Sequence, residues 1–83
     1  MNIDQYIEVN PKIMMGKPVI RGTRIPVELI LRKLSEGASE ENILEGYPTL
    51  RKQDIRAAIG YAASSVAHEE MVVDKSPRKR AKR

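Results

Sequence analysis

The chain contains no cysteine, phenylalanine or tryptophan, and a single histidine, among its 83 residues. Without cysteine, neither a disulfide nor a thiolate zinc site can stabilise the fold. The core must therefore be built from Ile, Leu, Val, Met and Ala. Because so short a chain buries only about 60% of the surface that its unfolded form exposes, we expect one thin-cored domain that gains stability by dimerising or by docking onto a partner.

Long hydrophobic runs are also missing. No apolar stretch approaches the length needed to span a bilayer, and the N-terminus lacks the basic and then apolar pattern of a signal segment. The sequence therefore predicts a cytoplasmic protein.

The positive charge is concentrated at one end. Residues 74–83 hold six basic residues and one acidic residue, whereas residues 1–73 hold nine basic and ten acidic residues. The net charge of +4 therefore comes from the tail, and the body is nearly neutral. We predict a folded domain over 1–73 and a basic C-terminal tail over 74–83 that is disordered on its own.

The stretch from Gly16 to Val27 has the composition of a small β-hairpin that leads into a helix. Gly22 suits a tight turn, and Pro26 suits the first turn of the following helix. A strand around residues 6–9 is predicted to pair with this hairpin. The apolar run 13–15 is either the end of a second strand or an adaptable plug. Such a plug would face the core, which is favoured, or a partner.

Helical spacing then predicts three helices. The first presents one apolar stripe and ends at Gly37, and the second begins at Ser39 as its N-cap, carries Glu40 and Glu41 in its first turn and ends near Gly46. The third is predicted from about residue 50 or 51 to about 68 or 70. The apolar stripe of the first helix is Val27, Ile30, Leu31 and Leu34; the second should bury Ile43 and Leu44; and the third should pack through Ile55, Ala58, Ile59, Ala62 and Val66. Gly60, in mid-helix, either permits close packing in a dimer or is simply tolerated.

The run from Gly16 to Val27 resembles the signature of the bacterial domain-of-unknown-function 433 family, and the pieces Gly37-Ala38-Ser39, Tyr47-Pro48 and Asp54-Ile55 are similar to that family's later pattern. The resemblance covers about residues 3–67. It implies a mainly α fold, with N-terminal β elements before a three-helix, homeodomain-like (helix-turn-helix) bundle. It also implies an antitoxin encoded beside a toxin with a PIN-like nuclease fold. In the family a hydroxyl residue commonly stands at the position of Arg51, so the cap of the third helix should be weak here.

Catalysis has little support in the sequence. The single histidine, the missing cysteine and the lack of paired-carboxylate spacing argue against an enzyme, and no phosphate-cradling loop is present. Glu40, Glu41 and Glu45 are better explained as a solvated helix face than as metal ligands. We expect no cofactor, no metal and no catalytic residue.

Two sets of residues are candidates for binding. A helix-turn-helix would place the start of the third helix in the major groove, where Arg51, Lys52, Gln53 and Arg56 could contact base edges; a charged solvent face is the alternative. For a protein partner, the candidates are Lys17, Arg21 and Arg24 of the hairpin and Arg78, Arg80 and Arg83 of the tail. The tail could contact DNA phosphates, act as an import signal or enter an acidic pocket on a protein partner. The last of these fits the resemblance, because the tail's arginines would suit a carboxylate-rich nuclease site.

The sequence and the resemblance together predict the antitoxin of a type II toxin–antitoxin pair. Such a protein would inhibit a PIN-like ribonuclease toxin and repress its own operon by binding operator DNA, as a homodimer or as a hetero-oligomer with the toxin. The alternative is a stand-alone helix-turn-helix transcriptional regulator without a toxin partner.

Overall fold

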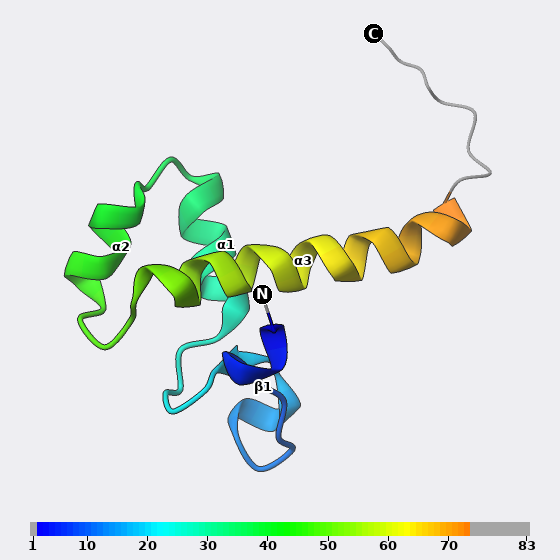
Figure 1. The fold of residues 1–83 in the computed structure, drawn as a ribbon, viewed down its shortest axis with the longest axis horizontal. Helices are drawn as coiled ribbons and strands as arrows, with labels where there is room; N and C mark the ends of the chain where they lie inside the picture. The colour runs from blue at the N-terminus through cyan, green and yellow to red at the C-terminus, as the bar shows by residue number, and fades with distance from the viewer. Residues whose placement is uncertain (1, 74–83) are drawn as a thin grey trace, which may run out of the picture.

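The computed structural model describes the backbone of residues 2–73 and the side chains of residues 2–67. A two-stranded antiparallel sheet comes first and three helices follow (Figure 1), which confirms the predicted fold class. The elements are η1 (Ile3–Gln5), β1 (Ile7–Glu8), η2 (Met14–Gly16), β2 (Val19–Ile20), α1 (Val27–Ser35), α2 (Glu40–Gly46) and α3 (Lys52–Val73). The predicted basic tail lies outside the described residues.

The sheet joins the N-terminal strand to the predicted hairpin. Ile7 lies opposite Ile20 and Glu8 opposite Val19, so the strand expected over 6–9 is confirmed but shorter. Gly22 closes the following turn with φ +85°, a conformation that a residue without Cβ adopts freely. The returning arm pairs through a single bridge between Val19 and Pro26, because proline has no N–H with which to extend a ladder.

The helix ends follow the local signals in the sequence. Pro26 is the N-cap of α1, one position before the first turn where it was expected. Gly37, at φ +99°, follows the end of α1. The Ser39 side chain accepts a hydrogen bond from the Asn42 N–H, and the Asn42 side chain accepts one from the Ser39 N–H. This reciprocal capping box fixes the start of α2.

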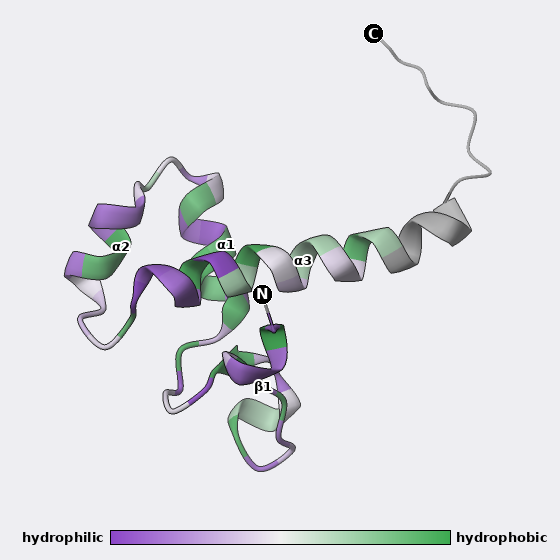
Figure 2. Cartoon of the chain, viewed as in Figure 1, coloured by the Kyte–Doolittle hydropathy of each residue, from purple (hydrophilic) through white to green (hydrophobic). Residues whose placement is uncertain are grey.

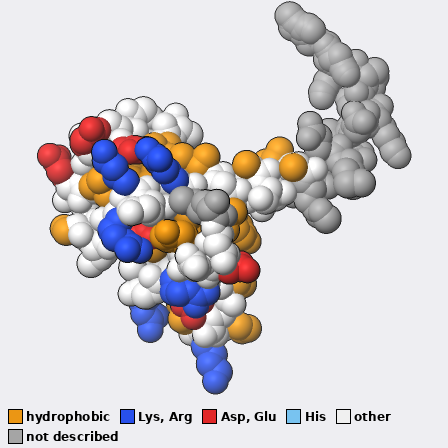
Figure 3. Space-filling model, in the orientation of Figure 1, with side chains coloured by type: hydrophobic (Ala, Val, Ile, Leu, Met, Phe, Trp, Pro, Cys, Tyr) orange, Lys and Arg blue, Asp and Glu red, His pale blue; other side chains and the backbone are white. Residues whose placement is uncertain are grey.

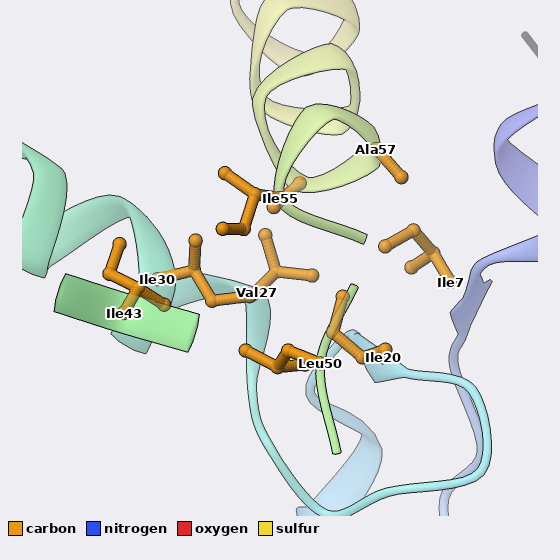
Figure 4. Close-up of a cluster of buried hydrophobic side chains, with 9 residues drawn as sticks. Ile7, Ile20, Val27, Ile30, Ile43, Leu50, Ile55 and Ala57 are labelled. Atoms are coloured by element: carbon orange, nitrogen blue, oxygen red, sulfur yellow. The ribbon is translucent and has the colours of Figure 1, made fainter. Parts of the chain in front are cut away.

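The core lies where α3 crosses the sheet and the two shorter helices (Figure 4). Its buried residues come from every part of the described chain: Ile7, Ile20, Val27, Ile30, Ile43, Leu50, Ile55, Ala57 and Ala58. Leu31, Leu34 and Leu44 pack against it and are partly buried. Because the side chains of Ala57 and Ala58 are small, the sheet and the other helices can pack close to the backbone of α3.

The predicted inner face of α3 is partly wrong. Ile59 is 45% exposed and Val66 is 61% exposed, whereas Ala57, which was not predicted, is fully buried. Helical spacing is the same for any apolar stripe, so it could not show which face of α3 meets the body. Gly60 has an intramolecular role: a Cβ there would lie 3.3 Å from Cδ1 of Ile3, and its absence lets η1 pack closely against α3.

The segment 13–15 is not a core element, contrary to the favoured expectation. Met14 and Met15 have φ values of +50° and +58°. The backbone of both residues is therefore in the left-handed region, which normally favours glycine. Met15 is 94% exposed. The segment is a tight turn that presents Met15 to solvent, because the backbone direction reverses here between β1 and β2.

Within residues 2–73, none of the helices combines the length and the apolar composition that crossing a membrane requires.

Candidate nucleic-acid and partner interfaces

Three polar side chains form an exposed cationic surface at the start of α3. Lys52, Gln53 and Arg56 are all exposed and border one shallow hollow. Figure 3 shows basic side chains gathered over the part of the molecule where α3 begins, with acidic side chains beyond them over α2. We call Lys52, Gln53 and Arg56 the cationic patch. It can donate hydrogen bonds to phosphates or to base edges.

Arg51, the fourth predicted DNA-contacting residue, also has neighbours within the domain. Its guanidinium lies 3.6 Å from the Asp54 carboxylate and 5.9 Å from the centre of the Tyr6 ring. Its backbone N–H donates to Oδ2 of Asp54 at 2.9 Å. The Arg51 side chain is still 66% exposed, so these contacts leave it accessible at the start of α3.

Asp54 is the residue that sequence reasoning missed. It is only 3% exposed. As the third residue of α3, it accepts a hydrogen bond from the backbone N–H of Arg51, the residue just before the helix. This bond is half of a capping box. The three-residue spacing between Arg51 and Asp54 is the signal in the sequence, because a capping carboxylate stands three residues after the N-cap. The cap predicted to be weak is instead supplied by this carboxylate, which holds the first turn of α3, and with it the cationic patch, in place.

The basic residues of the hairpin point to different neighbours. The Lys17 ammonium donates to the Glu28 carboxylate at 2.6 Å, and this hydrogen bond, with the positive charge behind it, holds the pKa of Glu28 below its ordinary value. Arg21 donates to the carbonyl oxygens of Asp4 (2.9 Å) and Ile7 (3.1 Å). Only Arg24 of the three lacks a hydrogen bond or ion pair within the described residues.

This arrangement ties the hairpin to α1 through Lys17 and to η1 through Arg21. The hairpin does not gather its three cations into one anion site. The candidate partner residues of the tail, Arg78, Arg80 and Arg83, lie outside the described residues.

An apolar groove of about 380 Å³ lies between α1, α3 and the start of β2. Its apolar lining comes from Pro18, Val27, Leu31, Tyr61, Ala62 and Val66. The Lys17–Glu28 ion pair stands at its rim. No local pattern could have revealed this groove, because its walls come from segments far apart in the sequence.

Among the side chains of residues 2–67, no three acidic or histidine residues gather closely enough to hold a metal ion. Glu41 and Glu45 are exposed on the short helix α2, and Glu40 is half-buried there. They give that end of the molecule a negative surface.

Comparison with known proteins identifies relatives of the whole domain. A family described as "Protein of unknown function (DUF433)" matches residues 7–62. The uncharacterized protein y4eO of Sinorhizobium fredii is 38% identical over 61 residues, which make up 74% of this chain and 28% of that relative; the chain thus spans little more than a quarter of the relative's length. The crystal structure of a DUF433 member from Anabaena variabilis is similar, with a TM-score of 0.69 and 29% identity over 82% of this chain and 67% of that chain. With a family match over more than half of its length and a fold shared with a solved member, the chain belongs to the DUF433 family.

Proposed function

We propose that this protein is the antitoxin of a type II toxin–antitoxin pair, which binds and inhibits a PIN-like ribonuclease in the cytoplasm and also binds operator DNA. The observation that carries the DNA-binding half of the proposal is the cationic patch on a helix start that a buried carboxylate fixes in position. Nothing in this account requires the chain to catalyse a reaction; its residues act by binding.

The DNA-binding half of the proposal rests on the order and chemistry of α2 and α3. A short helix, a turn and a longer helix follow one another, and the first turns of the longer helix carry the exposed Lys52, Gln53 and Arg56. In a helix-turn-helix these positions contact base edges and phosphates. The acidic residues of α2 would lie near the DNA backbone, so the body alone should bind with modest affinity.

The toxin-binding half rests on the family resemblance and on the charge of the tail. A PIN-like nuclease site is a cluster of carboxylates around divalent metal ions. Arginine binds carboxylates through two parallel hydrogen bonds, so Arg78, Arg80 or Arg83 inserted into the cluster would displace the metal. Without the metal the nuclease loses the hydroxide that attacks the phosphodiester.

The alternative function is a stand-alone transcriptional regulator, and the same cationic patch favours it. The two functions differ in one measurable property. An antitoxin forms a stable complex with the nuclease encoded beside it, whereas a stand-alone regulator binds DNA only.

The DNA half is tested by titrating the upstream operator with the full chain and with Lys52→Ala/Arg56→Ala. Because a good base contact is worth about 1–3 kcal/mol, the double variant should bind at least about tenfold more weakly. The matched control is Lys12→Ala/Arg32→Ala, which removes the same charge from exposed positions elsewhere. Equal losses in both variants would refute a specific role for α3.

The toxin half is tested by measuring RNA cleavage by the adjacent nuclease in the presence of full-length chains. The variant Arg78→Ala/Arg80→Ala/Arg83→Ala should fail to inhibit. The control Lys75→Ala/Lys79→Ala/Lys82→Ala removes equal charge but keeps the arginines, and it should inhibit well. Unchanged inhibition by the arginine variant would remove the tail from the mechanism.

A further inference from the structure

Arg21 is an exposed arginine whose guanidinium is held by the N-terminal segment. Its Nη2 donates to the carbonyl oxygen of Asp4 at 2.9 Å and to that of Ile7 at 3.1 Å. A guanidinium has five N–H donors in one plane, and these bonds use the two donors of a single nitrogen. Within the described residues, no hydrogen bond or ion pair involves Nη1 or Nε of Arg21. The guanidinium is therefore fixed in direction while its remaining donors are available to another acceptor.

Tyr6 connects this arginine to the start of α3. The Arg21 N–H donates to the Tyr6 carbonyl oxygen at 2.8 Å, and the two carbonyls that hold the guanidinium belong to residues on either side of Tyr6 in the sequence. The centre of the Tyr6 ring lies 5.9 Å from the Arg51 guanidinium. Arg51 directly precedes Lys52, the first residue of the cationic patch. Two exposed arginines from distant segments thus lie next to one tyrosine, beside the cationic patch.

The charges around these arginines leave them able to bind an anion. Asp4 and Glu8 are acidic and lie in η1 and β1, but neither forms an ion pair with Arg21 within the described residues. Asp54, the acidic neighbour of Arg51, is buried and accepts a backbone N–H. Figure 2 shows that α3 is hydrophilic at its start and mostly apolar along its middle. The start of α3 is therefore the part of that helix suited to a charged ligand.

We infer that Arg21 and Arg51 bind backbone phosphates of the same DNA duplex that the cationic patch contacts, an inference that rests on the DNA-binding half of the proposed function. Arginine binds phosphate through parallel N–H···O bonds, and a guanidinium that is already fixed loses little side-chain entropy on doing so. Phosphate contacts set the register and orientation of a protein on DNA, whereas base contacts specify the sequence. Arg21 and Arg51 therefore orient α3 on the duplex, and the cationic patch supplies the base contacts.

The position of Arg21 favours DNA over an acidic protein surface. The sequence grouped Arg21 with Lys17 and Arg24 as a partner-binding set, but the structure separates them, since Lys17 is paired with Glu28. Arg21 instead lies near Arg51 and the cationic patch. A duplex carries one negative charge per about 1.7 Å of its axis, so a single duplex can contact the patch and both arginines at once.

The test is a titration of two fluorescent duplexes, the upstream operator and a scrambled duplex of the same composition, with the full chain at several salt concentrations. Each phosphate contact adds about 0.9 to the slope of log K against log salt concentration. Arg21→Ala should therefore lower that slope by about 1 and weaken binding to both duplexes by the same factor, and Arg51→Ala should do the same. The matched control is Arg24→Ala, because Arg24 is exposed in the same turn but has no contact with η1; it should keep the natural slope.

A merely structural arginine would lower Tm, followed by circular dichroism, without changing the slope. Arg21→Lys keeps the test decisive if Arg21→Ala does not fold. Lysine keeps the charge, so the slope should stay, but both duplexes should bind more weakly because an ammonium lacks the planar fork; natural affinity in this variant would overturn the inference.

The remaining outcomes separate this inference from the proposed function. A natural slope in folded Arg21→Ala, or an equal reduction in Arg24→Ala, would overturn the inference alone. Failure of the natural chain to bind either duplex would overturn it together with the DNA-binding half of the proposed function. Inhibition of the adjacent nuclease should be unchanged in Arg21→Ala; lost inhibition with natural DNA binding would assign Arg21 to the protein partner instead.

Discussion

Replacing Asp54 is expected to destabilise the domain more than replacing any of the exposed polar residues at the start of α3. Its carboxylate is almost fully buried and accepts the Arg51 N–H at 2.9 Å. In Asp54→Ala that donor loses its partner, and a negative charge disappears from the N-terminal turn of a long helix. The change removes no core methyl group, so the effect isolates the cap.

The magnitude follows from these two losses. Removing a helix cap costs about 1 kcal/mol, and removing an acidic side chain from the first turn costs about 0.3–1 kcal/mol more. The free energy of unfolding should therefore fall by about 1.3–2 kcal/mol. For a domain of this size, 1 kcal/mol corresponds to about 4–8 °C in Tm, so Tm should fall by about 10 °C. Asp54→Asn keeps an oxygen acceptor and should lose less than half as much.

The assay is thermal and urea unfolding, followed by circular dichroism. Arg51→Ala is the matched control, because it keeps the backbone N–H and removes only a guanidinium that is largely exposed; exposed ion pairs contribute about 0–1 kcal/mol. If Asp54→Ala costs no more than Arg51→Ala, the carboxylate does not cap the helix and the reasoning fails.

Three further predictions concern the turn, the helix contact and the ion pair. Met15→Gly should stabilise the domain by up to about 1 kcal/mol. The left-handed backbone costs methionine roughly 1–2 kcal/mol, whereas the extra entropy of glycine in the unfolded chain costs roughly 0.5–1 kcal/mol. A urea midpoint no higher than that of the natural chain would contradict this. Gly60→Ala should gain less than the helix-propensity value of about 1 kcal/mol in the natural chain, but nearly all of it with Ile3→Val, which lacks Cδ1; equal gains would disprove the contact. The pKa of Glu28, measured by NMR titration, should rise toward 4.5 in Lys17→Ala. Because the folded-state pKa is the lower one, the pair stabilises the fold above pH 4.5 and this contribution disappears as pH falls through the lowered pKa; a stability difference between the two proteins that stays constant on acidification would refute it.

Local signals in the sequence predict most of the fold. Gly37 marks the end of α1 because glycine adopts a positive φ without strain. Ser39 marks the start of α2 because its side chain accepts a hydrogen bond from a backbone N–H of the first turn. Neither signal depends on a distant residue. The apolar spacing of α1 likewise identifies its buried face. The features that could not be predicted depend on contacts between distant segments, such as the approach of Ile3 to Gly60.

The candidate site shows the same division. Lys52, Gln53 and Arg56 were predicted as a group and lie together on one exposed surface, because helical geometry alone brings them there. The sequence could not show the neighbours of Arg51, because the Tyr6 ring near its guanidinium comes from the N-terminal part of the domain. The exposure of Ile59 and Val66 was also missed, since their spacing fits a buried face and an exposed apolar face equally well.

The most direct test of the proposed role is the ribonuclease activity of the adjacent toxin as the full chain is added. RNA cleavage should fall to the background level when the chain is equimolar with the nuclease, and the two proteins should then elute as one complex. Undiminished cleavage in a large excess of folded chain would contradict it.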